Sequence, residues 1–191
     1  MVEPASRPVE KSLDSATGLY RVRIISGQYY ACSANELVST VLGSCVSAVF
    51  WDAEKGIGGI NHFMHPGSCP SDRMRANTPG VAYYGQEAMS ELLERMKSLG
   101  ADCGNLTIKL FGGASLRSEK DDGIGAKNSE FAKKFLSQKG YTVAAADLGG
   151  PFPRKIVLNT ETGKVMVKRL RSIQRQQIAA QEISVFDPSK R

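Results

Sequence analysis

Five short segments rich in apolar and β-branched residues follow one another in the first third of the chain. They span residues 20–25, 28–32, 37–41, 46–51 and 57–64, with turn residues between them. No segment with helical spacing separates them, so the pattern lacks the strand–helix alternation of a parallel α/β sheet. This order favours an α+β fold over a doubly wound parallel sheet.

Two later segments have the spacing of amphipathic helices. Residues 81–99 and 128–139 place apolar side chains three and four apart and end before Gly100 and Gly140. Further strands are predicted at 106–111, 141–148, 155–159 and 164–170. The pattern therefore predicts one α+β domain over residues 19–170, with about seven to nine strands and two main helices.

The two ends of the chain lack a sustained hydrophobic period. Residues 1–18, which include Pro4 and Pro8, predict a flexible N-terminal tail, and residues 171–191 predict a polar C-terminal extension. No segment approaches the roughly 20 apolar residues that span a bilayer, and the polar start does not resemble a signal peptide. We therefore predict a cytoplasmic protein without membrane insertion.

The charge balance is only modestly basic. The formal charge is +6, from 25 Lys and Arg against 19 Asp and Glu, and no run of five basic residues occurs. A nucleic-acid interface would rest on Lys168, Arg169, Arg171 and Arg175, which have no aromatic stacking platform nearby. We predict no nucleic-acid binding and interpret these charges as a solvated face, with the hypothesis that it helps to dock acidic protein helices.

Among the four cysteines, Cys45 has a distinctive setting. Cys32, Cys45, Cys69 and Cys103 are too widely spaced for a CxxC metal site, and most are expected to be reduced, buried residues. Cys45 follows the small residues Gly43 and Ser44 between two apolar segments. Backbone N–H groups in such a turn can stabilise an oxyanion, so Cys45 is either a nucleophile or a plain buried cysteine.

A nucleophilic thiol needs a base, and the chain has only two histidines, His62 and His65. Antiparallel pairing of the flanking strands would return His62 to Cys45, whereas His65 is interpreted as a loop residue. A hydroxyl before the turn would orient the imidazole. The even offset from Cys45 favours Ser39, and Thr40 stays open because the turn can break strand parity.

Three glycine-containing segments follow farther along the chain. Residues 111–114 and 123–128 match no nucleotide-binding fingerprint and are interpreted as turns that let segments pack closely near a site. Arg154, just after the Gly149-Gly150 pair, is a candidate to bind a substrate carbonyl or an acidic residue, with a solvated arginine as the alternative.

An ordered set of motifs lies within residues 20–170. It comprises LGSCV at 42–46, NHFM at 61–64, KLFGGA at 109–114, IG at 124–125 with Asn128, DLGG at 147–150, RK at 154–155 and TGKV at 162–165. Together these segments resemble the CheD family, the bacterial chemoreceptor glutamine deamidases. The resemblance implies a single-domain layered α/β/β sandwich, similar to the catalytic domain of cytotoxic necrotising factor toxins.

The same resemblance implies a reaction and its partners. CheD proteins hydrolyse the side-chain amide of selected glutamines on the cytoplasmic helices of chemoreceptors, giving glutamate and ammonia, with no metal or other cofactor. They often bind CheC, a phosphatase of the chemotaxis response regulator. Their catalytic cysteine and histidine fall on Cys45 and His62, and their third residue, commonly threonine, falls on Ser39. The expected oxyanion or substrate-positioning residues are Gly43, Ser44, Thr40 and Arg154.

Other functions use the same residues. A cysteine protease or a transglutaminase-like enzyme would share the Cys–His pair and the acyl-enzyme, and a binding partner of CheC or receptors would need no catalysis. The segment Gln176–Glu182 resembles the modified segments of chemoreceptors, which suggests a tail that mimics substrate; an exposed polar helix is the simpler interpretation.

Overall fold

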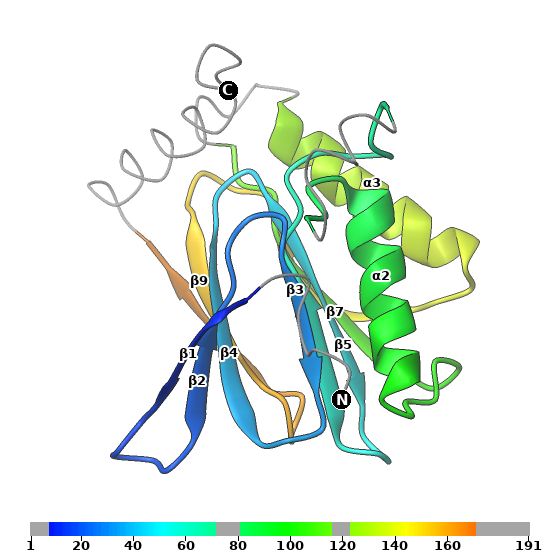
Figure 1. The fold of residues 1–191 in the computed structure, drawn as a ribbon. Helices are drawn as coiled ribbons and strands as arrows, with labels where there is room; N and C mark the ends of the chain where they lie inside the picture. Colours follow the sequence, from blue (N-terminus) through cyan, green and yellow to red (C-terminus); the bar gives the residue numbers. More distant parts are fainter. Residues whose placement is uncertain (1–7, 72–80, 116–122, 171–191) are drawn as a thin grey trace.

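The structure is a computed structural model that describes residues 8–71, 81–115 and 123–170. In these residues two five-stranded sheets face each other, and helices α2 (Gly85–Ser98) and α3 (Ile124–Gln138) cover the outer side of one of them (Figure 1). The predicted α+β sandwich with two main helices is confirmed. Its likeness to the cytotoxic necrotising factor domain stays a prediction.

The helix-covered sheet has the strand order β3-β6-β5-β7-β8. Its central strands are buried on both faces, so β5 reads as an apolar run without alternation. The last strand is parallel to its neighbour, because α3 forms the crossover between β7 and β8. The bounds are β3 Tyr29–Cys32, β5 Val46–Asp52, β6 Ile57–Asn61, β7 Thr107–Gly112 and β8 Val143–Leu148.

The second sheet has the strand order β1-β2-β4-β9-β10. Its bounds are β1 Glu10–Leu13, β2 Tyr20–Arg23, β4 Glu36–Leu42, β9 Arg154–Asn159 and β10 Val165–Arg169. Buried and more exposed residues alternate along β4, as expected for a strand whose inner face packs on the other sheet while its outer face does not.

Strand β1 lies inside the segment expected to be a flexible tail, so that expectation is wrong for residues 10–13. The strand pairs antiparallel with β2, and Lys11 makes an ion pair with Glu36 of β4 at 2.6 Å. All four β1 residues are exposed, and such a strand carries no hydrophobic alternation for sequence reasoning to detect. The predicted C-terminal extension and its substrate-mimic hypothesis lie outside the described residues.

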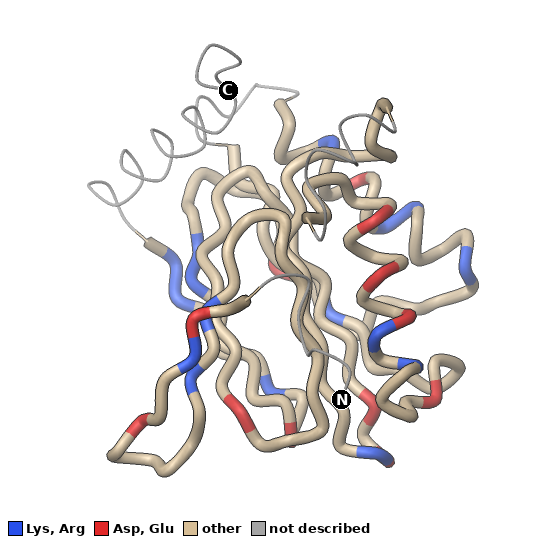
Figure 2. The backbone as a smooth tube through the Cα atoms, viewed as in Figure 1, with Lys and Arg blue, Asp and Glu red and all other residues tan. Residues whose placement is uncertain are grey.

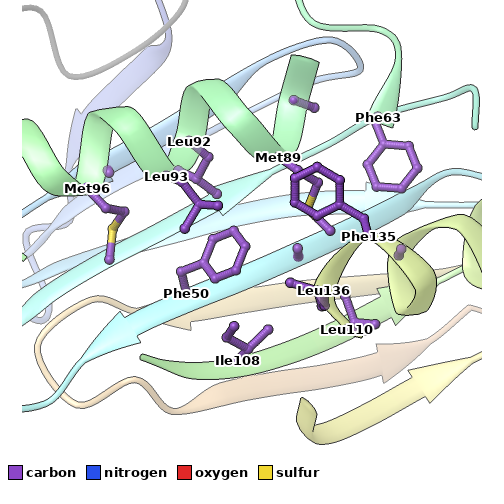
Figure 3. Packing of buried hydrophobic residues seen from close by; sticks show 14 of the residues in the cluster. Phe50, Phe63, Met89, Leu92, Leu93, Met96, Ile108, Leu110, Phe135 and Leu136 are labelled. Atoms are coloured by element: carbon purple, nitrogen blue, oxygen red, sulfur yellow. The ribbon is translucent and has the colours of Figure 1, made fainter. Parts of the chain in front are cut away.

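Two hydrophobic cores hold the layers together. One lies between the helices and the covered sheet, where Phe50, Ile108 and Leu110 meet side chains of both helices (Figure 3). The other lies between the two sheets and includes Leu42 and Cys45. In the first core, truncating a fully buried residue such as Leu92 to alanine would cost about 2–5 kcal/mol of stability.

Several strand ends meet at one end of the sandwich. Strand β4 ends where β9 begins, with Leu42 opposite Arg154, and β5 begins where β7 ends, with Val46 opposite Gly112. Val46 is also bridged to Phe63, just beyond β6. The loops that carry the predicted site residues are therefore neighbours. Within the described ranges, neither helix is long and apolar enough to cross a membrane.

Candidate functional site

The turn Gly43-Ser44-Cys45 crosses from the second sheet to the covered sheet, because it joins β4 to β5. Two backbone hydrogen bonds hold it from the segment after β7: the N–H of Ala114 donates to Gly43 O, and that of Gly113 to Cys45 O, both at 2.8 Å. A Cβ atom on Gly112, whose φ is +114°, would lie 2.1 Å from Cys45 O. The predicted close packing near a site is confirmed for residues 111–114. The predicted turn at 123–128 is wrong, because residues 124–128 form the first turn of α3.

Asn128 of α3 fastens this turn to the segment that follows the histidine. Its buried side-chain Nδ2 donates to Ser44 O at 3.1 Å and to Met64 O at 2.8 Å. The helix can approach so closely because a Cβ atom on Gly125 would lie 2.7 Å from the backbone oxygens of Gly113 and Ala114. Sequence reasoning did not assign Asn128 a role, although a polar residue on the inner face of an amphipathic helix was the available signal.

His62 returns to the cysteine as the antiparallel pairing predicted. Val46 and Phe63 exchange two backbone hydrogen bonds of 3.1 and 3.0 Å, and both side chains belong to the core beneath the helices. Their neighbours Cys45 and His62 therefore both point into the layer between the sheets, as diagonal cross-strand neighbours. Cys45 is 2 % exposed and His62 is 4 % exposed.

The imidazole bridges the two sheets through Thr40. Thr40 Oγ1 lies 2.8 Å from His62 Nδ1, and the same hydroxyl donates to Ile24 O at 2.9 Å. A hydroxyl has one proton to donate, so Thr40 accepts from Nδ1–H. This assignment leaves Nε2 unprotonated, which is the tautomer a general base needs.

The structure brings Thr40, and not Ser39, to the histidine, so the strand-parity argument for Ser39 is wrong. The Ser39 hydroxyl instead donates a hydrogen bond to Val22 O at 3.3 Å. Thr40 lies on the inner, buried face of β4, and Ser39 on its outer face. The turn after Leu42 changes sheets, so the alternation of side chains along β4 does not continue to Cys45. Thr40 was the alternative left open.

The environment keeps the imidazole uncharged. Burial lowers the pKa of His62 to about 4, because a charged ring would lose its hydration there. His65 is the loop residue that was expected: it stacks on Tyr84, with ring centroids 4.9 Å apart. Burial also lowers the pKa of His65.

Arg154 is bound within the chain, and the solvated alternative is wrong. Its guanidinium, 1 % exposed as a residue, donates to Asp147 Oδ1 at 2.9 Å and to Phe152 O at 3.2 Å, and also bonds the backbone oxygens of Asp147 and Gly149. In the sheet, Arg154 of β9 is also the backbone partner of Leu42, the last residue of β4. Arg154 therefore holds the loop between β8 and β9 beside the cysteine turn. The role in substrate positioning stays a prediction.

The other cysteines divide into two kinds. Cys32 is buried, and burial, together with the charge of Glu36, raises its pKa to about 11. Cys69 and Cys103 are half-buried and free, so the expectation that most cysteines are buried holds for two of the four. Across the described part of the chain, no three His, Cys, Asp or Glu side chains gather as a metal site.

The described part of the predicted basic patch lies on β10. Lys168 and Arg169 are exposed there, and Arg169 lies 3.3 Å from Asp147 Oδ1. Figure 2 shows basic residues spread over several strands of the second sheet. Arg171 and Arg175 lie outside the described residues, and docking through this patch stays a hypothesis.

Fold and site define a class: a two-sheet sandwich, covered by helices on one side, with a buried cysteine, histidine and threonine at one end. The family model described as CheD chemotactic sensory transduction matches residues 64–169. The chain belongs to the CheD family.

Relatives match over most of the chain. A probable chemoreceptor glutamine deamidase CheD of Hahella chejuensis is 38 % identical over 170 residues, which cover 89 % of this chain and 80 % of the relative. Proteins of the same name from Methylobacillus flagellatus and Vibrio vulnificus are 37 % and 41 % identical. They cover 94 % and 80 % of this chain, and 91 % and 73 % of their own lengths.

Proposed function

We propose that this protein is a protein-glutamine deamidase that converts selected glutamine side chains of chemoreceptors to glutamate and ammonia, with Cys45 as the nucleophile. The observation that carries the proposal is the 2.8 Å contact between His62 Nδ1 and Thr40, made on the sheet face that also holds Cys45. The names of the relatives supply the substrate class.

The chemistry starts from a thiol and a neutral imidazole, in keeping with the lowered pKa of His62. Nε2 takes the Cys45 proton as the sulfur attacks the carboxamide carbon, and the imidazolium then protonates the leaving ammonia. A thioester remains. His62 next activates a water molecule, whose oxygen displaces the sulfur and gives glutamate. Thr40 acts through His62, since it holds the ring in the required tautomer.

The turn around Ser44 and Cys45 supplies the proposed oxyanion donors. Asn128 fixes the Ser44 carbonyl on the helix side. The Cys45 N–H belongs to the same trans peptide unit, so it points away from the helix. Removal of one oxyanion-hole donor, a side-chain amide, costs about 3–4 kcal/mol in a well-studied protease. Gly43 and Ser44 serve here through their backbone.

The setting of the reaction belongs to the same proposal. The substrate glutamines lie on cytoplasmic helices of chemoreceptors, a CheC-type phosphatase is a second partner, and the protein acts in the cytoplasm. None of these steps uses a metal or an organic cofactor.

Mass spectrometry of a receptor tests the proposal. A cognate receptor fragment is incubated with wild-type protein, with Cys45→Ala and with Cys103→Ala as the matched control. We expect an increase of about 1 Da per modified glutamine and ammonia release with wild type and Cys103→Ala, and neither with Cys45→Ala. Unmodified receptor with wild-type protein, a cut receptor chain, or full activity of Cys45→Ala would contradict the proposal.

A further inference from the structure

The loop between β2 and β3 packs along the backbone of His62, and its Ile24 O also accepts the Thr40 hydroxyl. Gly27 N–H donates to His62 O at 2.7 Å, and His62 N–H donates to Gln28 O at 2.9 Å. Gly27 has φ +82°, and a Cβ atom there would lie 2.5 Å from the Val81 side chain. The backbone of this loop is therefore fixed relative to the histidine.

Ser26, in the same loop, contacts the ring nitrogen that the reaction uses. Its Oγ lies 3.3 Å from His62 Nε2, and the residue is half-buried. Because Nδ1–H is already given to Thr40, the neutral ring offers a lone pair at Nε2, and the Ser26 hydroxyl donates to it. Neither the strand pattern nor the family motifs had pointed to Ser26.

A hydroxyl can reverse its hydrogen bond without moving its oxygen. When Cys45 S–H breaks and Nε2–H forms, Ser26 can rotate its own proton away and accept from Nε2–H. Hydrogen bonds from a charged donor are about twice as strong as neutral ones. The hydroxyl therefore stabilises the imidazolium more than it stabilises the neutral ring.

We propose that Ser26 is a positioning residue for His62, whose hydroxyl changes from donor to acceptor as the proton passes from Cys45 to Nε2 and so favours the thiolate–imidazolium pair. Ser26 keeps its own proton throughout, and no other reactant is needed. The proposal rests on the proposed pairing of Cys45 with His62.

The test measures how fast chloroacetamide alkylates Cys45 in the full chain at neutral pH, quantified on the Cys45 peptide by mass spectrometry. Ser26→Thr and Ser26→Val form the matched pair, because they have nearly the same shape and differ in the hydroxyl. We expect Ser26→Thr to react within about twofold of wild type, and Ser26→Val and Ser26→Ala about fivefold more slowly. Ser39→Ala removes a hydroxyl that bonds Val22 O instead, and should leave the rate unchanged.

Equal rates for the threonine and valine variants, or faster alkylation in Ser26→Ala, would overturn the proposal. Buried Cys32 reports folding in the same samples, because its alkylation rises if a variant unfolds. The measurement uses no receptor. If the protein does not deamidate receptors, Cys45 can still be alkylated faster in Ser26→Thr than in Ser26→Val, and only the proposed function fails. If the two alkylation rates are equal while deamidation is normal, only the proposed role of Ser26 fails.

Discussion

The layer between the sheets buries polar side chains at both ends of β4, and the two ends are built differently. At the site end Thr40, His62 and Ser26 are connected by hydrogen bonds between neutral groups. At the far end Glu36 receives the Tyr30 hydroxyl at 2.6 Å and the Lys11 ammonium at 2.6 Å. We call Tyr30, Cys32, Glu36 and Lys11 the far-end cluster.

The far-end cluster shows what burial does when a charge is compensated. Glu36 has a cation and a hydroxyl donor, so the carboxylate is stabilised where it lies. Burial and then Glu36 act on the nearby groups, raising the pKa of Cys32 to about 11 and that of Tyr30 further above its usual value. The thiol there is held in its unreactive form, because the thiolate is the nucleophile.

The site end shows what burial does to a base that has no counter-charge among the described residues. His62 stays neutral, and its tautomer is fixed by Thr40, so a lone pair remains at Nε2. The two buried cysteines therefore differ through their neighbours: Cys45 shares its layer with an imidazole, and Cys32 with a carboxylate.

The largest predicted effect separates these two cysteines by activity. Cys45→Ala should lower receptor deamidation by at least about 10³-fold, because it removes the proposed nucleophile. Cys32→Ala should stay within about twofold of wild type, although it leaves a small cavity and lowers stability by about 1 kcal/mol. Ammonia release under identical conditions compares them, and similar losses for both variants would remove the distinction.

The next prediction concerns acid stability at the site end. The pKa of His62 is about 4 in the folded protein and about 6.5 when unfolded, so the unfolded state binds more protons between these values. The free energy of unfolding should therefore fall as pH drops from 6.5 towards 4, by up to about 3 kcal/mol from this residue.

Urea unfolding of wild type and His62→Gln at several pH values measures this contribution. The variant lacks the titrating ring, so its stability should decline less over the same window. His65→Gln is the comparison variant: burial lowers the pKa of that half-buried ring too, so it should flatten the decline, but less than His62→Gln does. Parallel stability curves for wild type and His62→Gln would show that the ring is not held neutral.

A smaller effect distinguishes the two hydroxyls of β4. Thr40→Val keeps the side-chain shape but leaves Nδ1–H without its acceptor, so kcat/KM for deamidation should fall about 10- to 100-fold. Ser39→Ala should stay within about twofold. A larger loss in Ser39→Ala than in Thr40→Val would restore the assignment that strand parity favoured.

The sequence predicted the parts of the molecule that local patterns control. Both helices and nearly all strands were placed within a few residues, since apolar periodicity and glycine stops are local signals. The antiparallel return that brings the His62 segment beside the Cys45 turn was also predicted, because it depends on one strand reversal, and Val46 and Phe63 confirm that return. The pairing of the Cys45 and His62 side chains stays a prediction.

Contacts across the sandwich were not predictable in this way. Thr40 meets His62 from the opposite sheet, Ser26 meets it from a loop 36 residues earlier, and Asn128 reaches Ser44 over 84 positions. Such contacts depend on how the layers stack, which no single segment encodes. β1 was missed for a related reason: it is held by backbone pairing with β2 and by the ion pair of its own Lys11 with Glu36, and neither leaves a hydrophobic pattern.

The smallest prediction returns to the far-end cluster. Glu36→Gln removes the second cause of the raised pKa of Cys32 and leaves burial, the larger cause, in place. The thiolate fraction of Cys32 at pH 8–9 should therefore rise, and its alkylation should become roughly severalfold faster. Alkylation of Cys45 in the same samples should not change, because Glu36 lies at the other end of β4.

Lys11→Met is the control for loosening of β1, since it removes the ion pair and keeps the carboxylate. If Glu36→Gln altered Cys45 as much as Cys32, the two ends of the layer would form one coupled unit, and the contrast between them would fail.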